Sequence, residues 1–185
     1  MHFRIGKTQL LSGLFLLVLL AACSSIKVLP SEAETGFRLS NYQTFDFYEL
    51  DASGDALGEN YLPQVELIKQ EITANLEQRG LRRSATNPDL LINLGIVAKE
   101  QVQTRQTDIR SDPPHYIGQR RYTWKSREVE VGRYTEGTLS VHLVDRARNE
   151  MVWRGAAESI VPQKPEKQQQ RIKEGVQKLL SEVPQ

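Results

Sequence analysis

The chain has 185 residues, a single cysteine and nearly balanced charges, with 24 basic and 23 acidic side chains and a net charge of +1. This balance lacks the basic excess with which proteins bind nucleic-acid phosphates, so we expect no nucleic-acid partner. One cysteine excludes an intramolecular disulfide, and a fold of this length must therefore be stabilised by a hydrophobic core.

Residues 1–22 have the order of a secretory signal. His2, Arg4 and Lys7 precede a largely apolar run from Leu10 to Ala22 that ends in small residues. At about 1.5 Å per residue this run makes a helix of about 20 Å, well short of the ~30 Å hydrocarbon core of a bilayer. We therefore expect a cleaved signal peptide, whose removal takes away two basic residues and no acidic one and leaves a net charge of −1.

Residues 20–23, LAAC, resemble the lipobox of bacterial lipoproteins, which is cut just before its cysteine. Cys23 would then be the first residue of the mature protein and would carry lipid on its thiol. At about 0.8 kcal/mol per buried methylene, two or three acyl chains make release from a membrane negligible. Ser24 stands where an aspartate commonly retains lipoproteins in the inner membrane, so we expect an outer-membrane anchor facing the periplasm. The alternative is a lone buried cysteine in an uncleaved helix.

Residues 23–40 have little regular pattern, and we expect them to form the lipidated N-terminus and a tether. Apolar and polar side chains alternate from Tyr42 to Tyr48, which predicts a first strand. The acidic stretch that follows is spaced like a calcium loop. Its positions for the sharp-turn glycine and the bidentate carboxylate hold Ala56 and Leu62, so we interpret it as a solvated connection.

The centre of the chain predicts one helix and one buried strand. From Pro63, apolar residues recur at steps of three and four until Gly80, which is typical of an amphipathic helix: Val65, Ile68, Ile72 and Leu76. Residues 90–97 alternate as a strand with apolar side chains on both faces. Residues 103–121 contain two consecutive prolines and many polar groups, and we expect them to form the longest irregular loop.

Three strand-like runs follow at 122–131, 134–144 and 151–161, and a final helix begins near Pro165. We therefore expect 41–185 to be a single α+β domain, an antiparallel sheet of about four or five strands with two helices packed on one face. The shared core should combine apolar residues of two strands with those of both helices: Leu90, Ile92, Leu94, Leu139, Val141, Leu143, Ile68, Ile72, Val176 and Leu179.

Short motifs occur in order along this domain: Tyr42-x-Thr44-Phe45, Asn87-Pro88-Asp89-Leu90, Glu136-Gly137-Thr138-Leu139, Asp145 and Trp153-Arg154-Gly155. Their order and spacing together resemble the bacterial lipoproteins grouped as domain of unknown function 4136. The resemblance implies an α+β domain on an envelope lipoprotein, and no activity is established for that family. Residues 103–121 depart most from the family pattern, so no partner contact there follows from the resemblance.

Catalytic and metal-binding motifs are missing from the sequence, which has no Gly-rich phosphate loop, nucleophile elbow or paired-histidine zinc motif. After cleavage only His115 and His142 remain, and we expect no metal and no cofactor. The best enzymatic pair is Glu128 and Glu130, about 7 Å apart on one strand face, a separation compatible with inverting glycoside hydrolysis. The same alternation is typical of a half-buried strand with charges outward, so we expect no enzyme activity and keep a cell-wall glycan hydrolase as the alternative.

A binding surface is the other candidate. Arg120, Arg121, Tyr122 and Trp124 combine arginine with aromatic side chains, as interface anchors often do. The competing interpretation is that the aromatic residues pack in the sheet and the arginines are solvated. We expect a lipid-anchored envelope protein with a structural or binding role, whose partners are the membrane through Cys23 and an envelope protein, a glycan or lipid headgroups.

Overall fold

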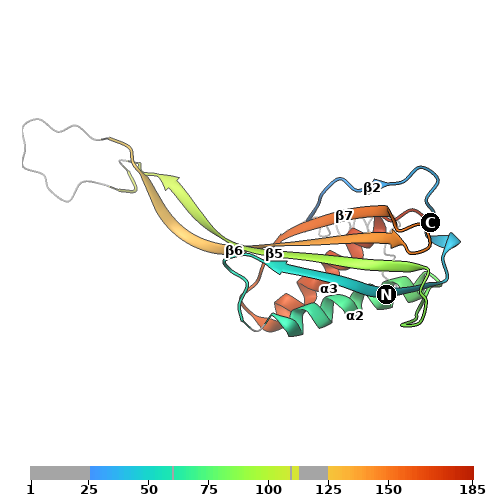
Figure 1. Ribbon diagram of the computed structural model, residues 1–185. Helices are drawn as coiled ribbons and strands as arrows, with labels where there is room; N and C mark the ends of the chain where they lie inside the picture. Colours follow the sequence, from blue (N-terminus) through green and yellow to red (C-terminus); the bar gives the residue numbers. More distant parts are fainter. Residues whose placement is uncertain (1–25, 60, 109, 113–124) are drawn as a thin grey trace, which may run out of the picture.

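The structure, a computed structural model, describes residues 26–59, 61–108, 110–112 and 125–185. Within these ranges it is an α+β fold with two α-helices, one short 3-10 helix and seven strands (Figure 1). In chain order the elements are β1 (Ile26–Val28), β2 (Glu32–Ala33), η1 (Leu39–Asn41), β3 (Thr44–Ser53), α2 (Leu62–Gln78), β4 (Arg82–Arg83), β5 (Leu90–Gln106), β6 (Glu128–Asp145), β7 (Glu150–Ile160) and α3 (Pro165–Ser181).

The sheet is mixed and larger than the sequence suggested. Its strand order is β1-β7-β6-β5-β3-β4, with β2 beside β7. The pairs β5–β6 and β6–β7 are antiparallel as expected, but β3 is parallel to both β5 and β4. The prediction of an antiparallel sheet of four or five strands was therefore inexact. Strand β3 is followed by helix α2 before β5 begins, and a helical crossover is the connection that returns a chain parallel to its starting strand.

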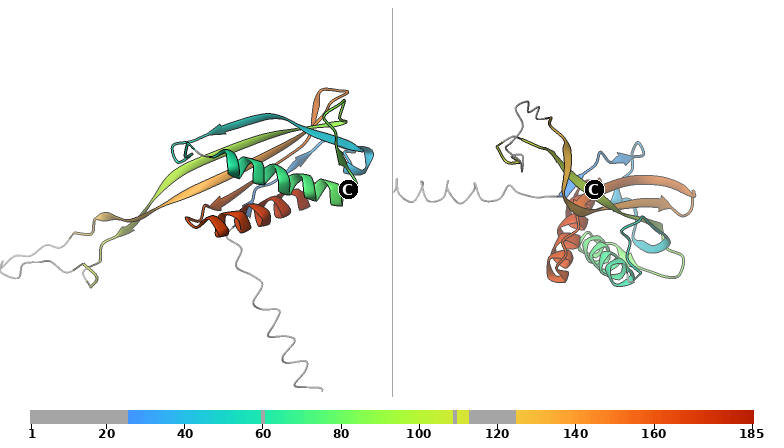
Figure 2. Two further views of the ribbon diagram at one scale, coloured as in Figure 1. Left: turned by 90° about the horizontal axis from the view of Figure 1, so that it is seen from below. Right: turned by 90° about the vertical axis from the view of Figure 1, so that its left-hand side faces the viewer.

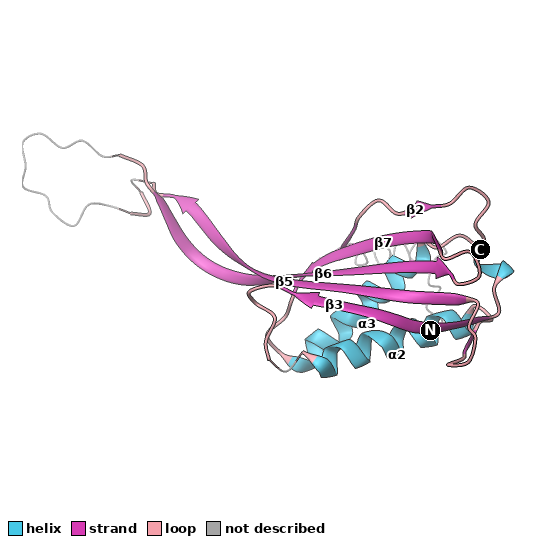
Figure 3. Ribbon diagram, viewed as in Figure 1, coloured by secondary structure: helices cyan, strands magenta, loops and turns pink. Residues whose placement is uncertain are grey.

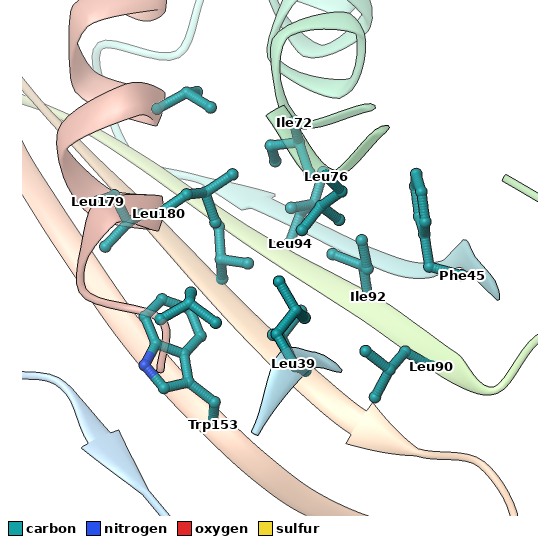
Figure 4. Close-up of a cluster of buried hydrophobic side chains, with 14 of the residues drawn as sticks. Leu39, Phe45, Ile72, Leu76, Leu90, Ile92, Leu94, Trp153, Leu179 and Leu180 are labelled. Atoms are coloured by element: carbon teal, nitrogen blue, oxygen red, sulfur yellow. The ribbon is translucent and has the colours of Figure 1, made fainter. Parts of the chain in front are cut away.

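Both helices pack against one face of the sheet, as the two views of Figure 2 show. The core between them contains all ten residues predicted from the sequence, with only Leu139 partly exposed. Figure 4 shows side chains from the strands and helices meeting there, together with Trp153 and Leu39. The sequence periodicities thus identified the core correctly.

Residues from Ile26 onward belong to the domain, although the sequence suggested a tether as far as residue 40. Strands β1 and β2 pair antiparallel with β7 and cover its outer edge. Ile26, Phe37 and Leu39 are buried in the core, and the Leu39 backbone N–H donates to the Pro184 carbonyl at 3.0 Å. Three apolar side chains at irregular spacing carry no helix or strand period, which is why the sequence pattern did not identify this segment.

Strands β5 and β6 continue beyond the rest of the sheet as a two-stranded arm, which we define as Glu100–Gln106 and Glu128–Thr135 (Figure 3). The neighbouring strands end before it: β3 pairs with β5 only as far as Val97, and β7 pairs with β6 only from Glu136. The two strands expected at 122–131 and 134–144 are one strand over the part the structure describes, and residues 103–106, expected in a loop, are paired.

Candidate functional site

A largely apolar pocket of about 360 Å³ lies between the sheet, the first half of α2 and residues 168–176 of α3. Its sheet side includes Ile96 and Leu139, and its helix side includes Ile68 from α2 and Ile172 from α3. Ile26, the first residue of β1, also lines it. The volume falls within the range of small-molecule sites, which are typically apolar and carry few polar groups.

The pocket is open because α3 supplies little bulk at this end. The start of the helix, Glu166–Gln170, has no apolar side chain, whereas its later residues Leu179 and Leu180 are fully buried. Gly175 lies on the same apolar stripe and lines the pocket, and a Cβ atom added there would meet nothing within 4 Å. The core is therefore closed around Leu179 and Leu180 at the end of α3 and hollow beside Gly175.

A few polar side chains border this space. Arg171 is half-buried and its Nη1 donates to the Ser159 hydroxyl at 2.9 Å. The Gln168 amide donates to the Pro162 carbonyl at 2.8 Å, and Glu158 forms an ion pair with Lys27 at 3.2 Å. Arg171 and Glu158 are the charged side chains among the described lining residues, and Glu158 is paired with Lys27, which lies outside the lining.

This pocket was not predicted from the sequence. Its residues come from segments far apart in the chain, which were interpreted separately: Ile68 and Leu139 as core, Ile26 as part of a tether and residues 56–58 as a solvated connection. A signal was present in Gly175, since glycine destabilises a helix interior and has no side chain to bury on an apolar stripe. A glycine at this position indicates a space beside the helix, but it does not show which other elements enclose that space.

Glu128 and Glu130 lie on the exposed arm, outside the pocket. Glu128 accepts a hydrogen bond from the Thr104 hydroxyl at 2.5 Å, and Glu130 accepts one from the Arg133 guanidinium at 2.6 Å. The hydrogen bond from Arg133 lowers the pKa of Glu130. A glycosidase acid needs a raised pKa, so Glu130 in this setting suits only the role of a base.

Three of the motifs that carry the family resemblance meet at the end of the sheet opposite the arm, namely those at Tyr42–Phe45, Asn87–Leu90 and Asp145, whereas Glu136–Leu139 lies at the base of the arm. The Tyr42 hydroxyl donates to Asp145 at 3.1 Å, and the backbone N–H groups of Gln43 and Thr44 each donate to Asp89 at 2.9 Å. The backbone N–H of Asp89 in turn donates a hydrogen bond to the Thr44 hydroxyl at 3.0 Å. These polar residues hold the ends of three strands together, which gives them a structural role.

The remaining predicted site residues lie outside the described part of the chain: Cys23 and the candidate contact Arg120, Arg121, Tyr122 and Trp124. Within the described ranges no three histidine, cysteine or acidic side chains are grouped so that they could hold a metal ion. No helix in that part of the chain is long and apolar enough to cross a membrane.

Comparison with solved structures finds similar folds at low sequence identity. A PDZ domain protein from Parabacteroides distasonis aligns with a TM-score of 0.52 at 16% identity, over 95% of this chain and 40% of that one. This chain thus spans two-fifths of that protein. The PelC dodecamer from Paraburkholderia phytofirmans aligns with a TM-score of 0.48 at 9% identity, over 86% of this chain and 99% of that one.

No curated protein matches the sequence. A family model described as "Domain of unknown function (DUF4136)" matches residues 31–185, which include every described element from β2 to α3. This range contains all the motifs on which the resemblance rested, and the chain belongs to the DUF4136 family.

Proposed function

We propose that the protein is a lipid-anchored binding protein of the bacterial cell envelope, attached through Cys23 to the outer membrane and facing the periplasm. The observation that carries the proposal is the lipobox-like LAAC at residues 20–23, directly after a short apolar run with a basic start. The absence of an aspartate after Cys23 favours the outer membrane.

The position of β1 supports an anchor close to the domain. Ile26 is buried in the core and follows Cys23 by three residues, so the lipid would lie within about 11 Å of the folded domain. Ile26 pairs with Ser159 of β7, Ser159 pairs with Gly137 of β6, and Gly137 pairs with Ala98 of β5. Ala98 and Gly137 are each two residues from the base of the arm. An anchor at Cys23 would therefore lie near the pocket and the base of the arm.

A binding role is favoured over catalysis by the kind of site present. The pocket is lined mainly by aliphatic side chains, which offer contact area but no nucleophile or acid–base pair. Gln168, Arg171 and Glu158 of the lining each bond to a neighbouring protein group. A ligand would be retained there without being changed.

Mass spectrometry of the mature protein tests the anchor. We expect the mature chain to begin at Cys23 with an acylated N-terminus, and we expect Cys23→Ser to leave an unprocessed precursor without lipid. Cell fractionation should place the wild-type protein with the outer membrane. A mature N-terminus at any other residue, or an unmodified Cys23 in membrane-bound protein, would refute the proposal.

A further inference from the structure

We propose that the pocket between the sheet, the first half of α2 and residues 168–176 of α3 binds one aliphatic chain of an amphiphile with an anionic head group, such as a fatty acid. The inference names a ligand for the binding role proposed above, and it does not depend on the lipid at Cys23. It rests on the shape, the lining and the charge of the pocket.

The size of the pocket suits a single chain. Its volume is about 360 Å³. Since a water molecule occupies about 30 Å³ of the liquid and a methylene group is of similar size, the space accommodates roughly twelve methylene groups. An apolar cavity of this kind gains little from water, because its walls offer few hydrogen-bond partners.

The lining is aliphatic where the chain would lie. The lining contains Val65 and Ile68 of α2, Ile172 and Val176 of α3, and Leu139 of β6. Gly175 leaves room beside them, because a Cβ atom there has no neighbour within 4 Å. Burying a twelve-carbon chain against such walls is favourable by about 0.8 kcal/mol for each methylene removed from water.

The charge favours an anionic head group. Arg171 is the half-buried cation of the lining and is oriented by the Ser159 hydroxyl at 2.9 Å. Glu158, the acidic side chain of the described lining, is paired with Lys27 at 3.2 Å. A carboxylate at Arg171 would form a charge-assisted hydrogen bond, whereas a cationic head group would be repelled.

Photolabelling of the full lipoprotein in its own membranes tests the inference. The probe is a dodecanoate that carries a diazirine at the end of its chain, with unlabelled dodecanoate as competitor. We expect displaceable adducts in the peptides that carry Ile68 and Ile172. The N-terminal peptide in the same digest reports the acylation of Cys23. The proposed ligand and the proposed anchor can therefore be refuted independently of one another.

Two leucine substitutions on α3 supply the matched comparison. Gly175→Leu fills the pocket and should reduce the adduct at least tenfold, whereas Gln177→Leu adds the same side chain at an exposed position and should leave it unchanged. Thermal unfolding establishes that both variants are folded. Should Gly175→Leu not fold, Arg171→Gln serves alone: it should lower the apparent affinity for the acid about tenfold and that for dodecanol little, and Arg171→Lys should restore part of the difference.

Three outcomes would overturn the inference. The first is the absence of displaceable label in these peptides, and the second is label that persists undiminished in a folded Gly175→Leu variant. The third is label that enters the pocket only in Cys23→Ser, which would mean that the protein's own acyl chain occupies the space. Equal affinity for the acid and the alcohol in the wild type would overturn the assignment of an anionic head group.

Discussion

Leu143 shows how one side chain ties the sheet to the helices. It lies on β6, is fully buried, and belongs to the same core as residues of α2 and α3. Truncation to alanine removes buried methyl groups and leaves a cavity, so we expect Leu143→Ala to lower the free energy of unfolding by about 2 to 5 kcal/mol. Denaturant titration measures this loss. Met151→Ala, at a side chain that is 45% exposed, is the control and should change stability little.

Asp89 makes the stability of the molecule depend on pH. Hydrogen bonds from the backbone of Gln43, and then of Thr44, lower the pKa of Asp89 below its ordinary value of 3.8. A lowered folded-state pKa means that the carboxylate stabilises the fold above the unfolded-state value and loses this contribution as pH falls through the folded-state value.

We therefore expect Asp89→Asn to be less stable than the wild type at pH 7, with the difference shrinking below about pH 4 as the native carboxyl is protonated. Unfolding measured across pH 2 to 7 for both proteins tests this. A difference that stays constant over the whole range would mean that the charge of Asp89 makes no contribution.

At the scale of the elements, two glycines in the sheet–helix interface should respond to alanine in opposite ways. Gly175 lies inside α3 with nothing within 4 Å of an added Cβ, whereas a Cβ on Gly155 of β7 would lie 2.7 Å from the ring of Trp153. We expect Gly175→Ala to raise the free energy of unfolding by about 0.5 to 1 kcal/mol, through helix propensity.

Gly155→Ala should instead lower stability by about 1 to 3 kcal/mol, because Trp153 is buried and its ring has to move. Thermal or denaturant unfolding of the pair gives both signs in one experiment. A loss of stability in Gly175→Ala would show that the space beside α3 is filled, and would also weaken the argument for the pocket.

The strands differ in how far their pattern predicted them. In Leu90–Val97 the alternation gave both the strand and its buried face, because one face packs under the helices. In the arm the described side chains are mostly exposed, so the sequence contains no buried stripe, and the continuity of β6 through Glu128–Thr135 comes from pairing with β5. A register shift between Gln103 and Thr104 also interrupts the period of the arm.

At the scale of the whole molecule, the arm is separate from the core. None of the core residues belongs to Glu100–Gln106 or Glu128–Thr135, and its ion pairs, such as Arg133 with Glu130 and Glu100, are exposed. Exposed ion pairs contribute little to stability. We therefore expect the domain to fold without the arm.

We expect replacement of residues 102–133 by a two-residue Asn-Gly turn to leave the free energy of unfolding within about 1 kcal/mol of the wild type. Denaturant titration checks the value. Photolabelling with the dodecanoate probe should be retained, because Thr135 is the arm residue in the described lining and it remains in this variant. A large loss of stability would show that the arm contributes to the fold.

The sequence by itself determined the two helices, the central strands, the core residues and the family, because each depends on local periodicity or short motifs. The lipid attachment at Cys23 is also a prediction of sequence alone, since the residue lies outside the described structure. Only the tertiary structure decided that β3 is parallel to β5, that Ile26 and Leu39 complete the core, and that a pocket lies beside Gly175. These features arise from contacts between segments distant in the chain, where the side chain that fills or leaves a space belongs to another element.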